Sequence, residues 1–61
     1  MKTLPRNADD LVGSFRTFGE FGPLYKVLCK ASDAKVHIVV VETGEELDYA
    51  VERAIADPEA D

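Results

Sequence analysis

The stretch KVHIVVVE, residues 35–42, decides the fold of this chain. Five of its six central positions hold β-branched apolar residues, and no helix-length pattern continues beyond it, so it predicts a β-strand. Alternation places Val36, Ile38 and Val40 on one face of that strand, and His37, Val39 and Val41 on the other. A strand that is apolar on both faces requires cover on both. The source of the second cover is the main question that the sequence raises.

The length of 61 residues predicts a single domain over residues 1–61, with frayed ends at 1–7 and 57–61. A domain of this size buries only about 60% of the surface that its unfolded chain exposes. The single cysteine and single histidine exclude an internal disulfide and a structural zinc site. An unpaired thiol is typical of a reducing compartment, and no stretch approaches membrane-spanning length. We therefore expect a cytoplasmic protein that does not enter a membrane.

The charge is distributed unevenly along the chain. Residues 1–35 carry six basic and four acidic residues, a net charge of +2, whereas residues 36–61 carry one basic and eight acidic residues, a net charge of −7. This asymmetry predicts an acidic surface built by the C-terminal third, which suits a basic partner. The alternative is that these acids only solvate a surface helix.

The segment before the first turn supports two interpretations. Asn7 as an N-cap, with apolar residues at helical spacing from Ala8 to Phe15, indicates a helix that ends near Gly19. Gly13 weakens that helix, and the β-rich residues 12–18 indicate a strand instead. We slightly favour the strand.

Residues 18–23, FGEFGP, predict a tight loop, because glycine permits positive φ and proline fixes φ and lacks a donor. We expect the rings of Phe18 and Phe21 to fold back and cap one face of the sheet. The next segment, residues 24–31, alternates as a second strand and returns through a short hairpin loop at residues 32–34. The expected core face places Tyr25, Val27 and Cys29 over the apolar residues at positions 36, 38 and 40.

Thr43 begins the last element with the capping-box pattern T-G-E-E. An apolar stripe at positions 47, 50, 51, 54 and 55 predicts an amphipathic helix over residues 44–56, ended by Pro58. Leu47, Tyr49 and Val51 also alternate, so residues 45–50 form a further strand in the alternative interpretation. The predicted fold class is α+β: a small antiparallel meander of two to four strands, with a C-terminal amphipathic helix packed on one face.

Side chains with potential chemistry are few. His37 is alone in the sequence pattern, and a general base or a metal site needs further groups within reach. Cys29 is expected to fill an apolar face rather than act as a nucleophile. We therefore expect no catalytic residue, no metal and no cofactor, and no enzymatic activity.

Three segments of the chain resemble a family of short, uncharacterised bacterial proteins. The segments are F-G-E-F-G-P at residues 18–23, V-E-T-G-E-E at residues 41–46 and A-D-P at residues 56–58. The resemblance spans roughly residues 12–60. It implies a bacterial origin and supplies no catalytic residue.

The leading functional hypothesis is a protein-interaction module, in which a small acidic protein binds or neutralises a basic protein, as antitoxins and inhibitors do, or binds a second copy of itself. The residues expected to bind the partner are Leu24, Leu28, Val39, Val41, Phe18, Phe21, Glu45, Glu46, Asp48 and Glu52. The alternatives are an accessory subunit of a larger enzyme and a nucleic-acid-binding regulatory module. The basic residues available to the latter are Arg16, Lys26, Lys30 and Lys35. The net negative charge disfavours nucleic acid, because phosphate affinity comes from positive charge.

Overall fold

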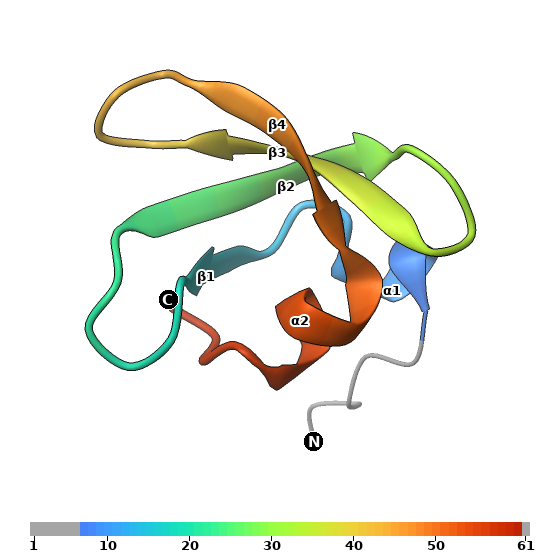
Figure 1. Ribbon diagram of the computed structural model, residues 1–61, viewed down its shortest axis with the longest axis horizontal. Coiled ribbons are helices and arrows are strands. Elements are labelled where there is room, and N and C mark those ends of the chain that lie inside the picture. Colours follow the sequence, from blue (N-terminus) through green and yellow to red (C-terminus); the bar gives the residue numbers. More distant parts are fainter. Residues whose placement is uncertain (1–6, 61) are drawn as a thin grey trace.

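The computed structural model describes residues 7–60, which form four strands and two short helices (Figure 1). The elements in chain order are α1 (Ala8–Leu11), β1 (Phe15–Thr17), β2 (Leu24–Lys30), β3 (Lys35–Val40), β4 (Glu46–Ala50) and α2 (Val51–Ala56). The expected fraying of residues 1–6 and 61 lies outside the described residues.

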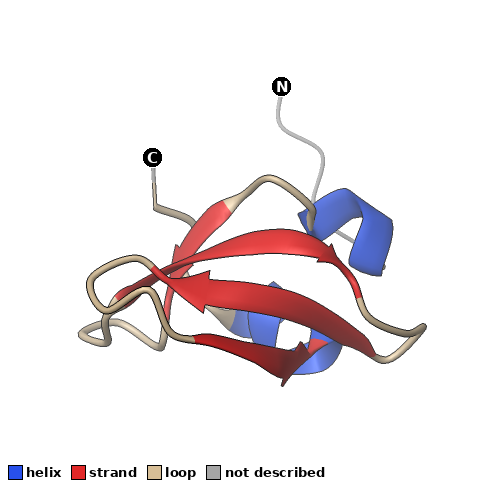
Figure 2. Cartoon of the chain, turned by 90° about the horizontal axis from the view of Figure 1, so that it is seen from above, coloured by secondary structure: helices blue, strands red, loops and turns tan. Residues whose placement is uncertain are grey.

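The four strands form one sheet in the order β1-β2-β3-β4, and every neighbouring pair is antiparallel. Both helices lie on the same side of this sheet, because both contribute residues to the one core cluster. Seen from above, α2 lies behind the strands (Figure 2). The expected α+β fold, an antiparallel meander with a C-terminal helix on one face, is therefore confirmed. The side of the sheet that faces away from both helices is called the open face below.

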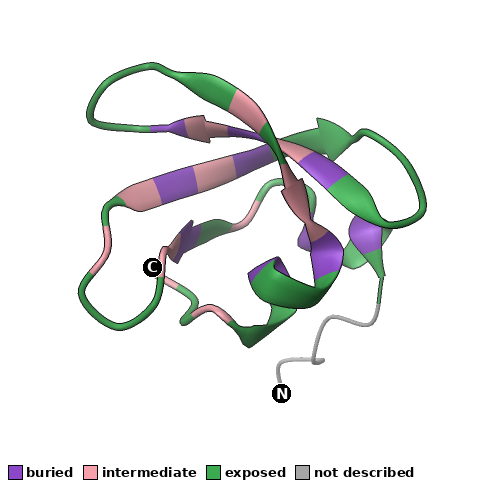
Figure 3. Cartoon of the chain, viewed as in Figure 1, coloured by how far each residue is buried: buried purple, intermediate pink, exposed green. Residues whose placement is uncertain are grey.

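The core lies between the sheet and the two helices. Alternate residues of β2 and β3 are buried, as the banded colouring of these strands shows (Figure 3). Helix residues complete the cluster, which consists of Ala8, Leu11, Tyr25, Val27, Val36, Ile38, Val51 and Ala54. The predicted division of the 35–42 strand into a core face and a less buried face is thus correct.

The expected helix over residues 44–56 is wrong in its first half, where the alternative strand forms. Gly44 has φ +76° and closes a tight turn in which the Gly44 N–H donates to the Val40 carbonyl over 2.7 Å. Pairing with β3 satisfies the backbone groups of alternate residues of β4 and turns Leu47 and Tyr49 toward the core. The backbone bonds and this burial outweigh the local helical preference, so only Val51–Ala56 is helical.

The sequence predicts that Cys29 lies on the core face, but the structure shows that Cys29 is exposed. The register of β2 against β3 shifts between Val27 and Cys29, so that Cys29 pairs with His37 instead of facing inward. This irregularity is a β-bulge, which inserts one residue and reverses the faces of the residues that follow. The core face of β2 therefore ends at Val27.

Each interpretation of the N-terminal segment is correct for one part of it. Asn7 caps α1 by accepting a hydrogen bond from the Asp10 N–H over 3.1 Å, and the helix ends after one turn. Gly13 then adopts φ +88°, and its N–H donates to the Val27 carbonyl over 2.8 Å. The chain thus crosses to the sheet and continues as β1.

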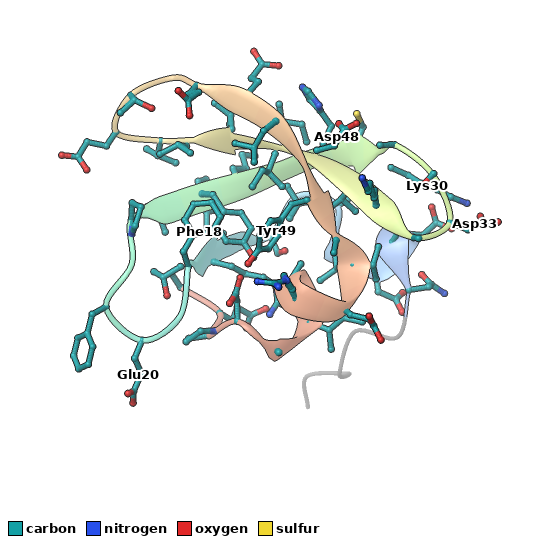
Figure 4. The ribbon with its side chains drawn as sticks, in the orientation of Figure 1. Phe18, Glu20, Lys30, Asp33, Asp48 and Tyr49 are labelled. Atoms are coloured by element: carbon teal, nitrogen blue, oxygen red, sulfur yellow. The ribbon has the colours of Figure 1, made fainter. Side chains whose placement is uncertain are left out.

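The loop between β1 and β2 orients its two phenylalanines differently. Phe18 packs against the core, with its ring centroid 4.5 Å from that of Tyr25 and 5.3 Å from that of Tyr49 (Figure 4). Phe21 is 97% exposed, so the expectation that both rings fold back is wrong for Phe21. The backbone explains the difference, because the Phe18 N–H donates to the Pro23 carbonyl over 3.1 Å and leaves residues between them at the loop tip.

Candidate interaction surface

The open face presents a group of apolar side chains that no described helix covers. It includes Phe15, Leu28 and Val41, which are 39%, 38% and 48% exposed, and the half-buried residues Leu24 and Val39. The expected contact residues Leu24, Leu28, Val39 and Val41 therefore belong to one surface. Exposed apolar side chains that gather on one face are typical of binding surfaces.

Lys26 lies within this apolar group. Its ammonium nitrogen is 5.4 Å from the ring centroid of Phe15, which is its cross-strand neighbour on β1. On its other side Lys26 pairs with Val39, and Val39 pairs with Glu46. A row across the sheet thus runs from an aromatic ring through a cation to a carboxylate.

The sequence predicts that His37 has no partner, and this is wrong. His37 bridges two carboxylates of β4. Its Nδ1 lies 2.9 Å from Asp48 Oδ1, and its Nε2 lies 2.8 Å from Glu46 Oε1. The hydrogen bond with Asp48, followed by that with Glu46, raises the pKa of His37 above its ordinary value. Antiparallel pairing of His37 with Asp48 creates this contact. The sequence pattern does not reveal this contact, because it favours a helix over residues 44–56.

Acidic residues continue around the turn that joins β3 to β4. Glu42 and Glu45 are exposed in this turn, and Glu46 and Asp48 follow on β4 with side chains 56% and 54% exposed. The apolar group therefore has an acidic border on the side of β4. Of the other expected contact residues, Glu52 is exposed on α2, on the opposite side of the sheet, and Phe18 is part of the core packing.

The basic residues proposed for nucleic-acid binding do not gather on one surface. Arg16 is 4% exposed, and its guanidinium donates to the Asp57 carbonyl over 2.9 Å on the core side. Lys30 forms an ion pair with Asp33 at the hairpin between β2 and β3 (Figure 4). Lys26 lies on the open face, so Arg16 and Lys26 occupy opposite faces of the sheet.

Asp57 organises the opposite side of the molecule. Its Oδ2 accepts hydrogen bonds from the hydroxyls of Tyr25 (2.7 Å) and Tyr49 (3.0 Å), and its Oδ1 accepts one from the Gly19 N–H (3.2 Å). Residues 57–60, which the sequence predicts to be frayed, are tied to β2, β4 and the loop after β1 through these bonds. An isolated bridge between Arg16 and Glu59 ties them to β1. No signal in the sequence pattern singled out this carboxylate.

Two further observations concern metal binding and membrane-spanning helices in residues 7–60. Within residues 7–60, no group of three histidine, cysteine or acidic side chains is placed to hold a metal ion. None of the helices in the same residues is long and apolar enough to cross a bilayer.

The comparison with protein families shows to which family the chain belongs. Residues 2–61 match a family described as "Family of unknown function (DUF5397)". The chain belongs to this family. The expected membership in an uncharacterised family is thereby confirmed. No curated protein and no solved structure matches the chain. The family description assigns no activity, so the function has to be inferred from the surfaces of this chain.

Proposed function

We propose that the protein is a non-enzymatic interaction module that binds a basic protein on its open face, in the manner of a small acidic antitoxin or inhibitor in the bacterial cytoplasm. The observation that supports this most directly is the apolar group of the open face with an acidic border along β4. A partner gains affinity by covering the apolar group and gains specificity and association rate from the acidic border.

The charge of the chain favours a basic partner over a second copy. Each chain carries a net charge of −5, so a dimer brings two acidic molecules together. Like charges placed together at an interface lower its stability, whereas opposite charges steer encounter. Lys26 is the cation within the apolar group, and its ammonium already lies over the ring of Phe15.

The proposal is tested by affinity capture from the host cell with three forms of the chain. The first is the wild type, and the second is the double variant Leu28→Ser/Val41→Ser, which removes two exposed apolar side chains of the open face. The third is the matched control Ile55→Ser, which removes a side chain of similar exposure (36%) from α2. A basic protein retained by the wild type and the control, but lost by the double variant, supports the proposal.

Two results would overturn it. One is a set of captured proteins that does not differ between the double variant and the control. The other is a chain that captures nothing and forms a stable dimer in solution, as measured by light scattering. Folding of each variant is checked first by its amide NMR spectrum, so that a lost contact is not confused with an unfolded chain.

A further inference from the structure

The two outer strands of the sheet, β1 and β4, differ in whether another segment pairs with their outer edges. The edge of β1 is covered by the C-terminal segment, in which the Thr17 N–H donates to the Pro58 carbonyl (3.2 Å) and the Ala60 N–H donates to the Phe15 carbonyl (2.7 Å). β4 has only β3 as a neighbour. Among residues 7–60, β4 is therefore the strand whose outer edge remains unpaired. An unpaired edge presents a row of backbone donors and acceptors to any incoming strand.

The ladder between β3 and β4 fixes which backbone groups of β4 point outward. At one end the Val40 N–H donates to the Glu45 carbonyl (2.7 Å), and at the other the Val51 N–H donates to the Ala34 carbonyl (2.9 Å). Hydrogen-bonded pairs alternate with non-bonded pairs in an antiparallel ladder. Residues 45, 47, 49 and 51 therefore turn their backbone toward β3. The groups of Glu46, Asp48 and Ala50 point away from the sheet.

The side chains of β4 define what an added strand would meet. Glu46 and Asp48 are more than half exposed on the open face, and each uses one carboxylate oxygen to contact His37. Leu47 and Tyr49 point to the other face and pack at the edge of the core. An added strand thus finds carboxylates at alternate positions on one face and apolar side chains at alternate positions on the other.

We infer that β4 accepts an extended segment of the partner as a fifth, antiparallel strand, and that this segment alternates basic and apolar residues. The inference deepens the proposed function and rests on it for the existence of a basic partner. Cross-strand pairing would place lysine or arginine opposite Glu46 and Asp48, and opposite charges in such pairs are favourable. Backbone bonds would supply affinity and the alternating side chains specificity.

The same geometry argues against a second copy at this edge. Antiparallel pairing of two β4 strands places Asp48 opposite Asp48, or Glu46 opposite Asp48, and like charges directly opposite each other are destabilising. Residues 46–50 contain no lysine, no proline and no register shift against β3, which are devices that commonly close an edge. The acidic side chains therefore exclude a copy of β4 while leaving the edge open to a basic strand.

The inference is tested with two synthetic heptapeptides of the sequence Lys-Val-Lys-Val-Lys-Val-Lys. In the first, the backbone nitrogens of the valines are N-methylated. These N–H groups point away from β4 in the predicted pairing. In the second, the backbone nitrogens of the last three lysines are N-methylated, which blocks the groups that would bond to β4. Charge and composition are the same. We expect the first peptide to bind at least about tenfold more tightly, because several backbone hydrogen bonds are lost in the second.

Hydrogen exchange and one substitution locate the contact. With the first peptide, exchange of the amides of Glu46, Asp48 and Ala50 should slow. Ala50 has φ −65°, which proline adopts without strain, so Ala50→Pro removes an outward N–H and leaves the β3 ladder intact. We expect about tenfold weaker binding for Ala50→Pro and unchanged binding for the control Ala50→Val, which keeps the donor.

Equal binding of the two peptides, or equal binding by Ala50→Pro and Ala50→Val, would overturn the strand addition. The result of this test can be distinguished from the result of the test of the proposed function. A basic partner whose capture depends on Leu28 and Val41 but not on the Ala50 donor would leave the proposed function standing and remove this inference. Loss of that partner with both sets of variants would support both.

Discussion

The hydroxyl of Tyr25 donates a hydrogen bond of 2.7 Å to the carboxylate of Asp57, 32 positions further along the chain. This bond joins the fully buried tyrosine of β2 to the segment that follows α2. Tyr49 donates to the same oxygen, and the three rings of Phe18, Tyr25 and Tyr49 lie within 5.4 Å of one another. The C-terminal segment is held against the sheet at this point. That contact also leaves β4, rather than β1, as the open edge.

Replacing Asp57 should lower the stability of the domain strongly. Asp57→Ala leaves two tyrosine hydroxyls and the Gly19 N–H without their acceptor. Hydrogen bonds to charged groups contribute about 1.5–3 kcal/mol each. Because these three bonds are exposed or only partly buried and their donors can bond to water instead, the loss is smaller than the sum of the three bonds. We expect the free energy of unfolding to fall by about 2–4 kcal/mol. This is comparable to the whole stability of about 3–5 kcal/mol that the core of so small a domain supplies. Urea denaturation followed by circular dichroism measures the change.

The control for this experiment is Asp33→Ala. Asp33 is fully exposed at a hairpin and pairs with exposed Lys30, so its loss should leave the free energy of unfolding almost unchanged. The account of Asp57 would be wrong if the two variants were equally stable. Asp57→Asn, which keeps an acceptor oxygen, should lie between the wild type and Asp57→Ala.

The tyrosines should make the fold sensitive to alkali. Burial, followed by the hydrogen bond to Asp57, raises the pKa of Tyr25 above the ordinary value of about 10, and the same causes raise the pKa of Tyr49. Because the unfolded chain loses these protons first, stability is fully present below pH of about 10 and declines as the pH rises above that value. Tyrosinate absorbance should therefore appear at higher pH in the native protein than in urea.

The two tyrosines are the only ones in the sequence, so a single substitution separates them. Tyr49→Phe should leave one titration, that of Tyr25, still displaced to high pH relative to the unfolded chain. Coincident titration curves in the native and urea-unfolded protein would contradict the prediction.

The titration of His37 should report the pairing of β3 with β4. Hydrogen bonds with Asp48 and then Glu46 raise its pKa above the ordinary value of about 6.5. The stabilisation from the charged imidazole is fully present below that value and is lost as the pH rises through the higher pKa of the folded state. NMR titration of the ring protons measures the pKa directly. Asp48→Asn and Glu46→Gln should each lower it, whereas the distant control Asp33→Asn should not.

The central part of the fold follows from local patterns that the sequence displays. Val36, Ile38 and Val40 lie on one face of a β-branched strand, and the short loop at residues 32–34 requires the preceding strand to be an antiparallel neighbour. The open face, with Leu24, Leu28, Val39 and Val41, follows from the same alternation. These features were predictable because strand period and hairpin length act over only a few residues.

Other features depend on contacts between distant segments. Leu47 fits both a helical stripe and a strand alternation. Residues 46–50 form a strand because their backbone pairs with the edge of β3, and this edge is not visible in the local sequence. The bulge that exposes Cys29 arises between β2 and β3 and has no glycine or proline to mark it. Asp57 is separated from Tyr25 by 32 positions. A carboxylate at a helix end has many roles, so its contact with Tyr25 was not predictable from spacing.

Gly22 should be the glycine that tolerates substitution least. A Cβ added at Gly22 would lie 1.8 Å from the carbonyl oxygen of Phe18 and 2.6 Å from its carbonyl carbon, which are backbone atoms that cannot rotate away. Relief of the clash would displace the Phe18 N–H from the Pro23 carbonyl and the Phe18 ring from Tyr25. We expect Gly22→Ala to lower the free energy of unfolding by about 2–3 kcal/mol.

Gly44 provides the matched comparison, because it has φ +76° but nothing within 4 Å of an added Cβ. Gly44→Ala should therefore cost only the strain of a left-handed residue, about 1 kcal/mol. Urea denaturation of both variants measures the difference. If Gly44→Ala proved the more damaging substitution, conformational strain in the turn before β4, rather than the close approach of the loop to Phe18, would limit the stability of the sheet.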